Sequence, residues 1–243
     1  MSLSLGSTTI GSLYLGSTKI GEAYLGSTKV YASLPPAPPE RSFVMTFVDG
    51  VDLSTKLTYG YDSMTQVSVS PNVWNVTLSS GGYMSQFSSW AATSDLISVV
   101  ANLQGLGSSL TAMFTAQLGL KEAVIYIGTD VTDLTAFFAG SRGLEKLTLV
   151  GGGNVTNYSS LCSSCESLKK VPSVNTSSAT NVMDMFGNCH AVESGALALY
   201  QQMSSQATPP ATHDACFRDC GINTVTGAAE LAQIPTDWKE FRH

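Results

Sequence analysis

The chain has 243 residues, a net charge of −6 and a sequence pI of about 4.9, and only 12% of its residues are charged. This acidic balance argues against nucleic-acid binding, which needs a basic surface. A hydrophobic share of 43% is too high for a disordered chain, and no apolar run reaches the roughly 18 residues of a membrane span. Residues 1–10 lack the cationic and apolar stretches of a secretion signal, which predicts a protein assembled inside the cell.

Residues 1–33 repeat with a period of ten. The sequence Leu-Gly-Ser-Thr-Thr-Ile at 5–10 recurs, with small changes, at 15–20 and 25–30. Each copy joins two short β-type runs through Gly-Ser, which predicts a hairpin. Because one hairpin cannot bury an apolar face alone, we expect the copies to dock onto another surface. The apolar positions of this docking segment are Leu5, Ile10, Leu15, Ile20, Leu25 and Val30. A flexible tail is the alternative.

The next two segments are predicted to be a linker and a small β region. Residues 34–40 form the linker, because the four prolines within 34–39 favour an extended spacer. Residues 41–85 are expected to form strands joined by turns, since apolar and polar residues alternate there. This alternation involves Phe43, Met45, Phe47, Val67 and Val69.

A second repeat, with a period of 24, begins near residue 86. Four columns of residues recur without an insertion. Their members are Leu110, Leu134, Tyr158 and Val182; Trp90, Phe114, Phe138, Cys162 and Phe186; Leu96, Leu120, Leu144, Leu168 and Val192; and Val99, Ala123, Leu147 and Val171. Within a unit, the spacing Leu144-x-x-Leu147-x-Leu149 is typical of a leucine-rich-repeat strand. The prediction for residues 86–205 is a leucine-rich-repeat solenoid of about five units in a mainly β protein.

Charged residues follow the same period. One column contains Ile97, Lys121, Glu145, Lys169 and Glu193. Because neighbouring strands lie ~4.8 Å apart, this column predicts a ladder of alternating charge. Exposed ion pairs contribute only ~0.2–1 kcal/mol each, so the expected role of the ladder is to hold the register.

The end of the array departs from the repeat. Residues 195–206 have the composition of a helix, which Pro209-Pro210 ends, and a second helix is predicted over 227–233. Residues 206–243 are therefore expected to cap the apolar end of the stacked units.

Two segments resemble known families. The motifs Leu-Lys-Lys-Val-Pro at 168–172 and Val-Met-Asp-Met-Phe-Gly-Asn-Cys at 182–189 resemble the BspA-like leucine-rich repeats of bacterial surface proteins, which typically read M-F-x-x-C-x-x-L-x-x-[IV]-P. This resemblance covers about residues 86–220 and implies units that bind proteins or glycans, or form walls. The decads look like the short repeats that begin phage tail and fibre proteins, notably those of gut Bacteroidetes phages. That second resemblance implies attachment to a virion.

The cysteines are predicted to be core residues. Cys162 falls in an aromatic column, while Cys165, Cys189 and Cys220 form a column of their own. A buried free cysteine behaves as a small apolar residue. The pair Cys162-x-x-Cys165 leaves a disulfide or a zinc site as alternatives, but no metal and no cofactor is predicted.

No catalytic residues are predicted either. The histidines belong to no nucleophile or metalloprotease motif. A glycan-cleaving enzyme would need two carboxylates about 5–10 Å apart across a groove. Asp130 and Asp133 are the closest acidic pair on a turn, and Asp184 lies elsewhere in its unit. None of the three stacks in register with another acid.

The strand face opposite the core is the candidate binding surface. Its expected outward residues are Val124, Tyr126, Lys146, Thr148, Lys170 and Pro172. Tyr126, Lys146 and Lys170 are the predicted ligand contacts, and a solvated or subunit-buried face is the alternative.

Together with the resemblance of the decads to phage repeats, these patterns predict a non-enzymatic structural protein of a phage virion, such as a fibre, tail or capsid-decorating component. Its expected partners are other virion proteins, bound through residues 1–33, and further copies of the chain, with a trimer favoured by analogy with fibres. A glycan or protein of the host surface is a further expected partner. A bacterial cell-surface adhesin and an enzyme acting on glycans are the alternatives.

Overall fold

The computed structural model describes residues 34–55, 57, 61–79 and 94–241, together with the backbone of four strands between residues 13 and 32. The chain divides into two compact units, Met1–Pro36 and Ala37–His243. The boundary falls within the proline-rich segment. We call the two parts the N-terminal unit and the main unit.

The N-terminal unit contains two β-hairpins. Strand β1 (Leu13–Leu15) pairs antiparallel with β2 (Thr18–Ile20), and β3 (Glu22–Leu25) pairs antiparallel with β4 (Thr28–Ala32). Each hairpin corresponds to one decad, as the repeat predicts. The first decad lies outside the described residues.

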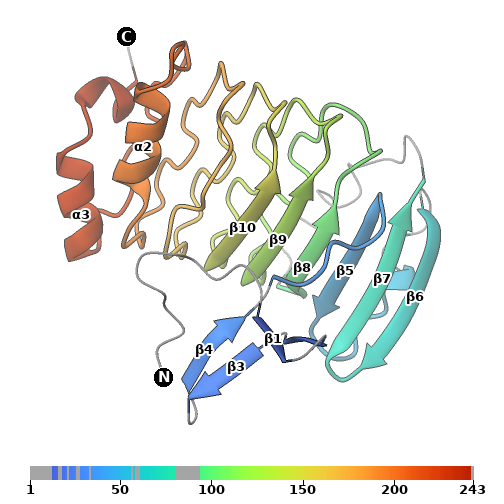
Figure 1. The fold of residues 1–243 in the computed structure, drawn as a ribbon. Coiled ribbons are helices and arrows are strands. Elements are labelled where there is room, and N and C mark those ends of the chain that lie inside the picture. The colour runs from blue at the N-terminus through green and yellow to red at the C-terminus, as the bar shows by residue number, and fades with distance from the viewer. Residues whose placement is uncertain are drawn as a thin grey trace. The chain divides into compact units, whose positions relative to one another are not determined.

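The described part of the main unit contains one open six-stranded sheet, in the order β10-β9-β8-β5-β7-β6 (Figure 1). The strands span Ser42–Phe47 (β5), Tyr61–Val69 (β6), Asn72–Leu78 (β7), Leu96–Asn102 (β8), Glu122–Ile127 (β9) and Lys146–Gly151 (β10), and a short 3-10 helix lies at Leu53–Thr55 (η1). Strands β8, β9 and β10 are parallel, with each residue opposite the one 24 positions along. The remaining pairs are antiparallel. The mainly β prediction and the 24-residue register are therefore confirmed.

The predicted leucine-rich-repeat solenoid is wrong. Among the described residues, the segment predicted to form it contributes three strands to an open mixed sheet, and residues 42–78 supply the other three. Residues 170–175, where the period places a further strand, form one isolated bridge within the described chain, to Ser194. Pro172 explains this loss, because proline has no N–H for a ladder and is excluded from central strands. On the other side of β8 lies antiparallel β5 in place of another 24-residue unit.

The turns opposite the sheet keep the 24-residue register even in the units beyond β10, where regular strand pairing stops. In each of these turns two residues have positive φ, and their N–H groups donate to carbonyls of the following unit. Ala136 (φ 54°) donates to Ser159 O at 2.9 Å, and Gly140 (φ 71°) donates to Ser163 O at 2.7 Å. The first position is occupied by Ala112, Ala136, Ser160 and Asp184, and the second by Ala116, Gly140, Ser164 and Asn188. Left-handed backbone costs a non-glycine residue roughly 1–2 kcal/mol, so these bonds between units must offset strain at each turn.

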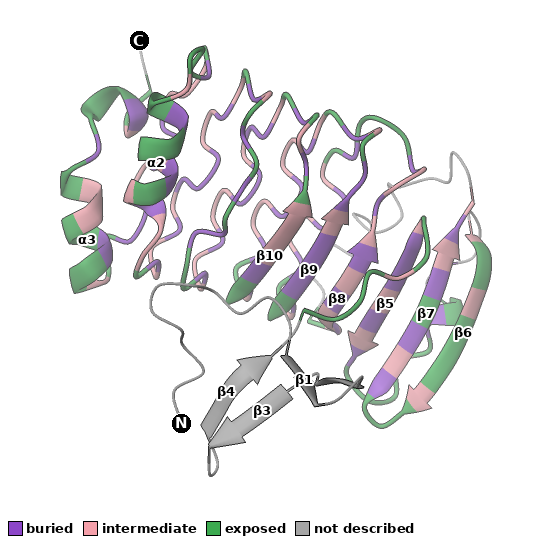
Figure 2. Ribbon diagram, viewed as in Figure 1, coloured by how far each residue is buried: buried purple, intermediate pink, exposed green. Residues whose placement is uncertain are grey.

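The predicted apolar columns form the core. Every member that lies in the described chain is buried, and Figure 2 shows buried positions recurring from β5 through β10 and on toward α2. The aromatic column is a direct stack in part: the Phe114 and Phe138 rings lie 5.7 Å apart at 14°, and Phe137 meets Phe138 edge-on at 4.9 Å. Each unit therefore buries its apolar face against its neighbours.

Helices α2 (Ala196–Ser204) and α3 (Val225–Ala232) lie where helices are predicted. Thr224 caps α3 by accepting a hydrogen bond from Gly227 N at 3.0 Å. A 3-10 helix, η2 (Thr236–Trp238), follows. Its Trp238 ring stacks on His213 at 4.3 Å and lies 6.4 Å from Phe217, at the end of the aromatic column. The C-terminal segment thereby covers the last unit.

Strand β6 is the exposed outer strand of the sheet. Val67 and Val69, expected to be half-buried, are 54% and 71% exposed. Among the described strands, β6 pairs with β7 alone and so lies at the edge of the sheet. In the part of the chain that the structure describes, neither helix approaches the length and hydrophobicity needed to cross a membrane.

Close approach between units requires glycine at position 143. A Cβ on Gly143 would lie 2.2 Å from Leu118 O, which is backbone of the preceding unit. We expect Gly143→Ala to lower the free energy of unfolding by about 1–3 kcal/mol, since the unit must shift to relieve the overlap. Gly153→Ala is the matched control, because its added Cβ would meet only the Asn175 side-chain amide, at 3.3 Å. Urea denaturation compares the two, and equal midpoints would contradict the prediction.

Candidate binding groove

The acidic residues considered for catalysis are engaged in structural contacts. Asp130 Oδ2 accepts from Gly105 N at 2.9 Å and, more weakly, from Gly107 N at 3.4 Å, which ties its turn to the preceding unit. Asp133 Oδ1 accepts from the backbone N–H and the hydroxyl of Thr135, at 2.8 and 2.6 Å. The bonds of Asp133 are those of a turn-forming aspartate. The structure does not direct the two carboxylates at a common site across a groove.

The five cysteines are buried and free, which confirms their prediction as core residues. Cys165 Sγ donates to Phe138 O at 3.2 Å, and Cys189 Sγ donates to Cys162 O at 3.1 Å. Ser141 does the same one unit earlier, donating to Phe114 O at 2.7 Å. In each case the acceptor is 27 residues back, in the preceding unit. The thiols are therefore structural donors that satisfy an inward carbonyl.

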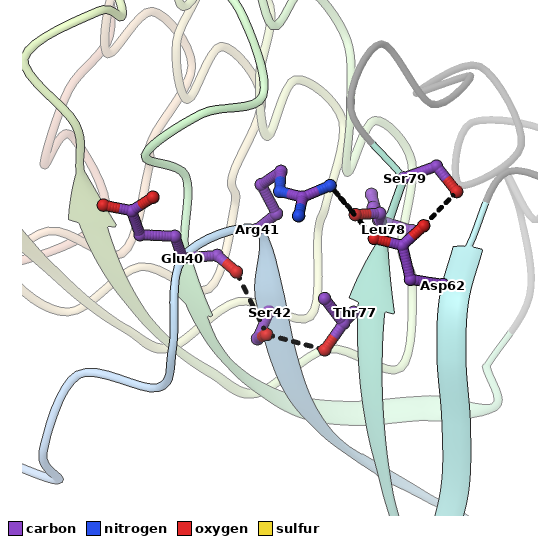
Figure 3. A network of polar contacts seen from close by, with 7 residues as sticks. All are labelled: Glu40, Arg41, Ser42, Asp62, Thr77, Leu78 and Ser79. Carbon is purple, nitrogen blue, oxygen red and sulfur yellow. Dashed lines mark hydrogen bonds and ion pairs between the residues drawn. The ribbon is translucent and has the colours of Figure 1, made fainter.

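A polar network fixes the start of the main sheet (Figure 3). Arg41 donates to Asp62 Oδ2 at 3.1 Å and to Leu78 O at 2.9 Å, linking the beginning of β5 to β6 and β7. Ser79 donates to the other oxygen of Asp62 at 2.7 Å. The Asp62 carboxylate thus bridges two strands, and the network anchors the chain just after the proline-rich segment.

The predicted charge ladder is present in the backbone register. The N–H groups of Glu145, Lys169 and Glu193 each donate to the carbonyl of the residue 24 positions earlier, at 2.8–3.1 Å. Its first rung is also an ion pair, with Lys121 Nζ 3.1 Å from Glu145 Oε1. Two further pairs with the same 24-residue spacing were not predicted: Glu122 with Lys146, and Arg142 with Glu166. All three pairs are exposed, so each contributes at most about 1 kcal/mol.

A groove of about 560 Å³ lies between β10 and the segment that follows it. Its lining residues are Glu145, Lys146, Leu147, Thr148, Leu149, Lys169, Lys170, Pro172 and Ser173. Lys169 N donates to Glu145 O at 3.1 Å, but from residue 170 onward the described backbone turns away from β10, and Val171 N donates instead to Ser194 O at 3.0 Å. The groove therefore opens where Pro172 ends the strand pairing.

The groove combines apolar surface with unpaired positive charge. Glu145 and Lys146 are paired with charges on β9 or just before it. Among the described residues, no carboxylate lies within ion-pair distance of Lys169 or Lys170. Leu149 is partly buried, although its register partners Ile125 and Ala101 are fully buried. An incompletely covered leucine beside two free ammonium groups suits a ligand with both apolar and anionic parts.

Two of the three predicted ligand contacts, Lys146 and Lys170, line this groove. Tyr126 does not belong to its lining and is half-buried on β9. Val124 and Pro172, expected to point outward, are buried; Val124 lies in register between Val100 and Thr148 of the flanking strands. Lys169 and Leu149 were missed as lining residues, and the signal that indicates them is Pro172 at a strand position of the repeat.

Of the predicted docking positions, Leu15, Ile20, Leu25 and Val30 lie in β1, β2, β3 and β4, where the structure describes the backbone alone. Leu5 and Ile10 lie outside the described residues. Within the described chain, no group of three or more His, Cys, Asp or Glu side chains is arranged to hold a metal ion.

Comparison with known proteins finds no matching family, no similar curated protein and no similar solved structure.

Proposed function

We propose that the chain is a non-catalytic structural protein of a phage particle: a fibre, tail or capsid-decorating component that docks through residues 1–33 and displays the main unit. The observation that supports this most is the separate N-terminal unit of repeated hairpins, joined to the main unit through a proline-rich segment. Two-stranded hairpins are marginal alone in water, so a repeated pair of them favours a role in docking.

The contacts of the main unit favour display over catalysis. Its candidate carboxylates are bound to turn backbone. Its five cysteines are buried in the core, where two of them donate hydrogen bonds to carbonyls of the preceding unit. Its proposed partners are other particle proteins, bound through the N-terminal unit, and further copies of the chain in a trimer. Its proposed location is the virion, after assembly in the host cytoplasm.

The test is to delete residues 1–33 and measure incorporation by quantitative mass spectrometry of purified particles. We expect the deleted protein to fold, because the main unit has its own core, and to be absent from particles. The control replaces residues 34–39 with Gly and Ser, which keeps the chain length, and should be incorporated normally. Normal incorporation of the deleted protein would refute the docking role.

The groove favours one alternative, a bacterial cell-surface adhesin, because it offers a ligand site without catalytic groups. Fractionation of the producing cells separates the two proposals. A phage protein is recovered with particles, whereas an adhesin is recovered with the cell envelope in the absence of particles.

A further inference from the structure

We propose that the groove beside β10 binds an extended, acid-bearing peptide segment of another protein by strand addition. Strand β10 ends the main sheet, and its only strand partner in the described chain is β9. Alternate backbone N–H and C=O groups of an outer strand face away from the sheet and are free to pair with another chain. This inference concerns the main unit and does not depend on the particle assignment.

The lining follows the free edge of the strand. The groove contacts β10 continuously from Lys146 to Leu149, and Glu145 extends it by one residue. At ~3.3 Å per residue, this edge accommodates about five residues of an extended chain. Leu147 and Leu149 point toward the core side and Lys146 and Thr148 toward the other side, so both faces of an added strand would meet side chains of β10.

The opposite wall selects for negative charge. Lys169 and Lys170 are exposed and line the groove, and they have no ion-pair partner in the described chain. Ammonium–carboxylate hydrogen bonds are stronger than neutral ones. A strand with Asp or Glu toward these lysines and an apolar residue toward Leu149 would therefore complement the site. An anionic glycan would use the lysines but not the main-chain edge of β10, so the observations favour a peptide.

The probes are a display library of peptides about seven residues long, the tightest peptide recovered from it, and polygalacturonate as an anionic glycan. Binding is measured to the full chain, to the double variant Lys169→Gln/Lys170→Gln, and to Arg142→Gln. Arg142 is an exposed cation away from the groove, which makes its variant the matched control. The tightest peptide is also synthesised with N-methyl groups on alternate residues, which removes its backbone donors and keeps its charge.

We expect the recovered peptides to contain Asp or Glu. Their affinity should fall at least about tenfold in the double variant and at least about tenfold on N-methylation, and it should be unchanged in Arg142→Gln. Binding should weaken from about 50 to about 500 mM NaCl. Thermal melting of each variant confirms that it is folded.

Three results would overturn the proposal. The first is that no acid-bearing peptide recovered from the library binds the full chain more tightly than it binds the double variant. The second is binding that N-methylation leaves unchanged. The third is lysine-dependent binding of polygalacturonate without binding of any peptide, which would assign the groove to a glycan.

Discussion

Raising the pH from about 8 to about 10 is expected to unfold much of the protein, because the folded core holds four buried thiols in the protonated form. A cysteine in the unfolded chain has a pKa of about 8.5. Burial raises the pKa of Cys162, Cys189 and Cys216 well above the ordinary value, and raises the pKa of Cys220 to about 12. The unfolded chain therefore loses protons from pH 8.5 upward while the folded chain keeps them.

The sign and the window follow from this difference. The stabilisation is fully present below about pH 8.5 and is lost as the pH rises, until Cys220 ionises in the fold near pH 12. Each thiol contributes a slope of about −1.4 kcal/mol per pH unit, so four together give about −5 kcal/mol per pH unit. Such a slope is large against a total stability of about 5–15 kcal/mol.

Urea denaturation at several pH values measures this slope directly. The variant Cys220→Ala serves as the internal comparison, since it should flatten the slope by about a quarter even if it lowers the stability itself. A free energy of unfolding that is equal at about pH 8 and about pH 10 would contradict the burial of these thiols.

Removing the ring of Phe138 is expected to lower the free energy of unfolding by about 3–5 kcal/mol in Phe138→Ala. The ring is fully buried. It stacks on Phe114 of the preceding unit at 5.7 Å and meets Phe137 edge-on at 4.9 Å. A cavity at this position removes contacts between two units that bury their apolar faces against each other. The loss in free energy of unfolding is therefore expected near the upper end of the range for a core substitution.

The matched control is Leu118→Ala, a truncation at a turn residue that is 38% exposed. It should cost less than about 1 kcal/mol. Chemical denaturation gives both values, and the slope against denaturant should be the same for the two variants if each remains two-state. A loss below about 1 kcal/mol in Phe138→Ala would show that the aromatic column does not join the units as described.

The sequence predicts the core well because the same chemical requirement recurs every 24 residues. Leu120, Leu144 and Leu168 must each face the same neighbour position, so one column indicates burial at all of them. The same recurrence led to the wrong prediction of a leucine-rich-repeat solenoid, because the spacing of apolar residues does not show whether the backbone N–H groups pair with the next strand. Pro172 belongs to the segment that resembles BspA-like repeats, yet its missing N–H is what ends the regular pairing beyond β10.

The hydrogen bonds between units could not be predicted from the sequence, for a different reason. Cys165 and Ser141 differ in chemistry, and only the position of a carbonyl 27 residues back shows that both are donors with one role. The groove was predictable in part. Lys146 and Lys170 stand out as basic residues on the repeat. The gap between β10 and residues 170–173, however, follows from backbone pairing, which side-chain periodicity does not encode.

The docking role of the N-terminal unit is tested most directly by transplanting it. Residues 1–36, the whole N-terminal unit, are fused to an unrelated fluorescent protein and produced in infected cells, and the copies per purified particle are counted by fluorescence. We expect the fusion to reach the copy number of the full chain and to compete with it for incorporation. Particles that exclude the fusion but incorporate residues 37–243 alone would contradict the proposed docking role.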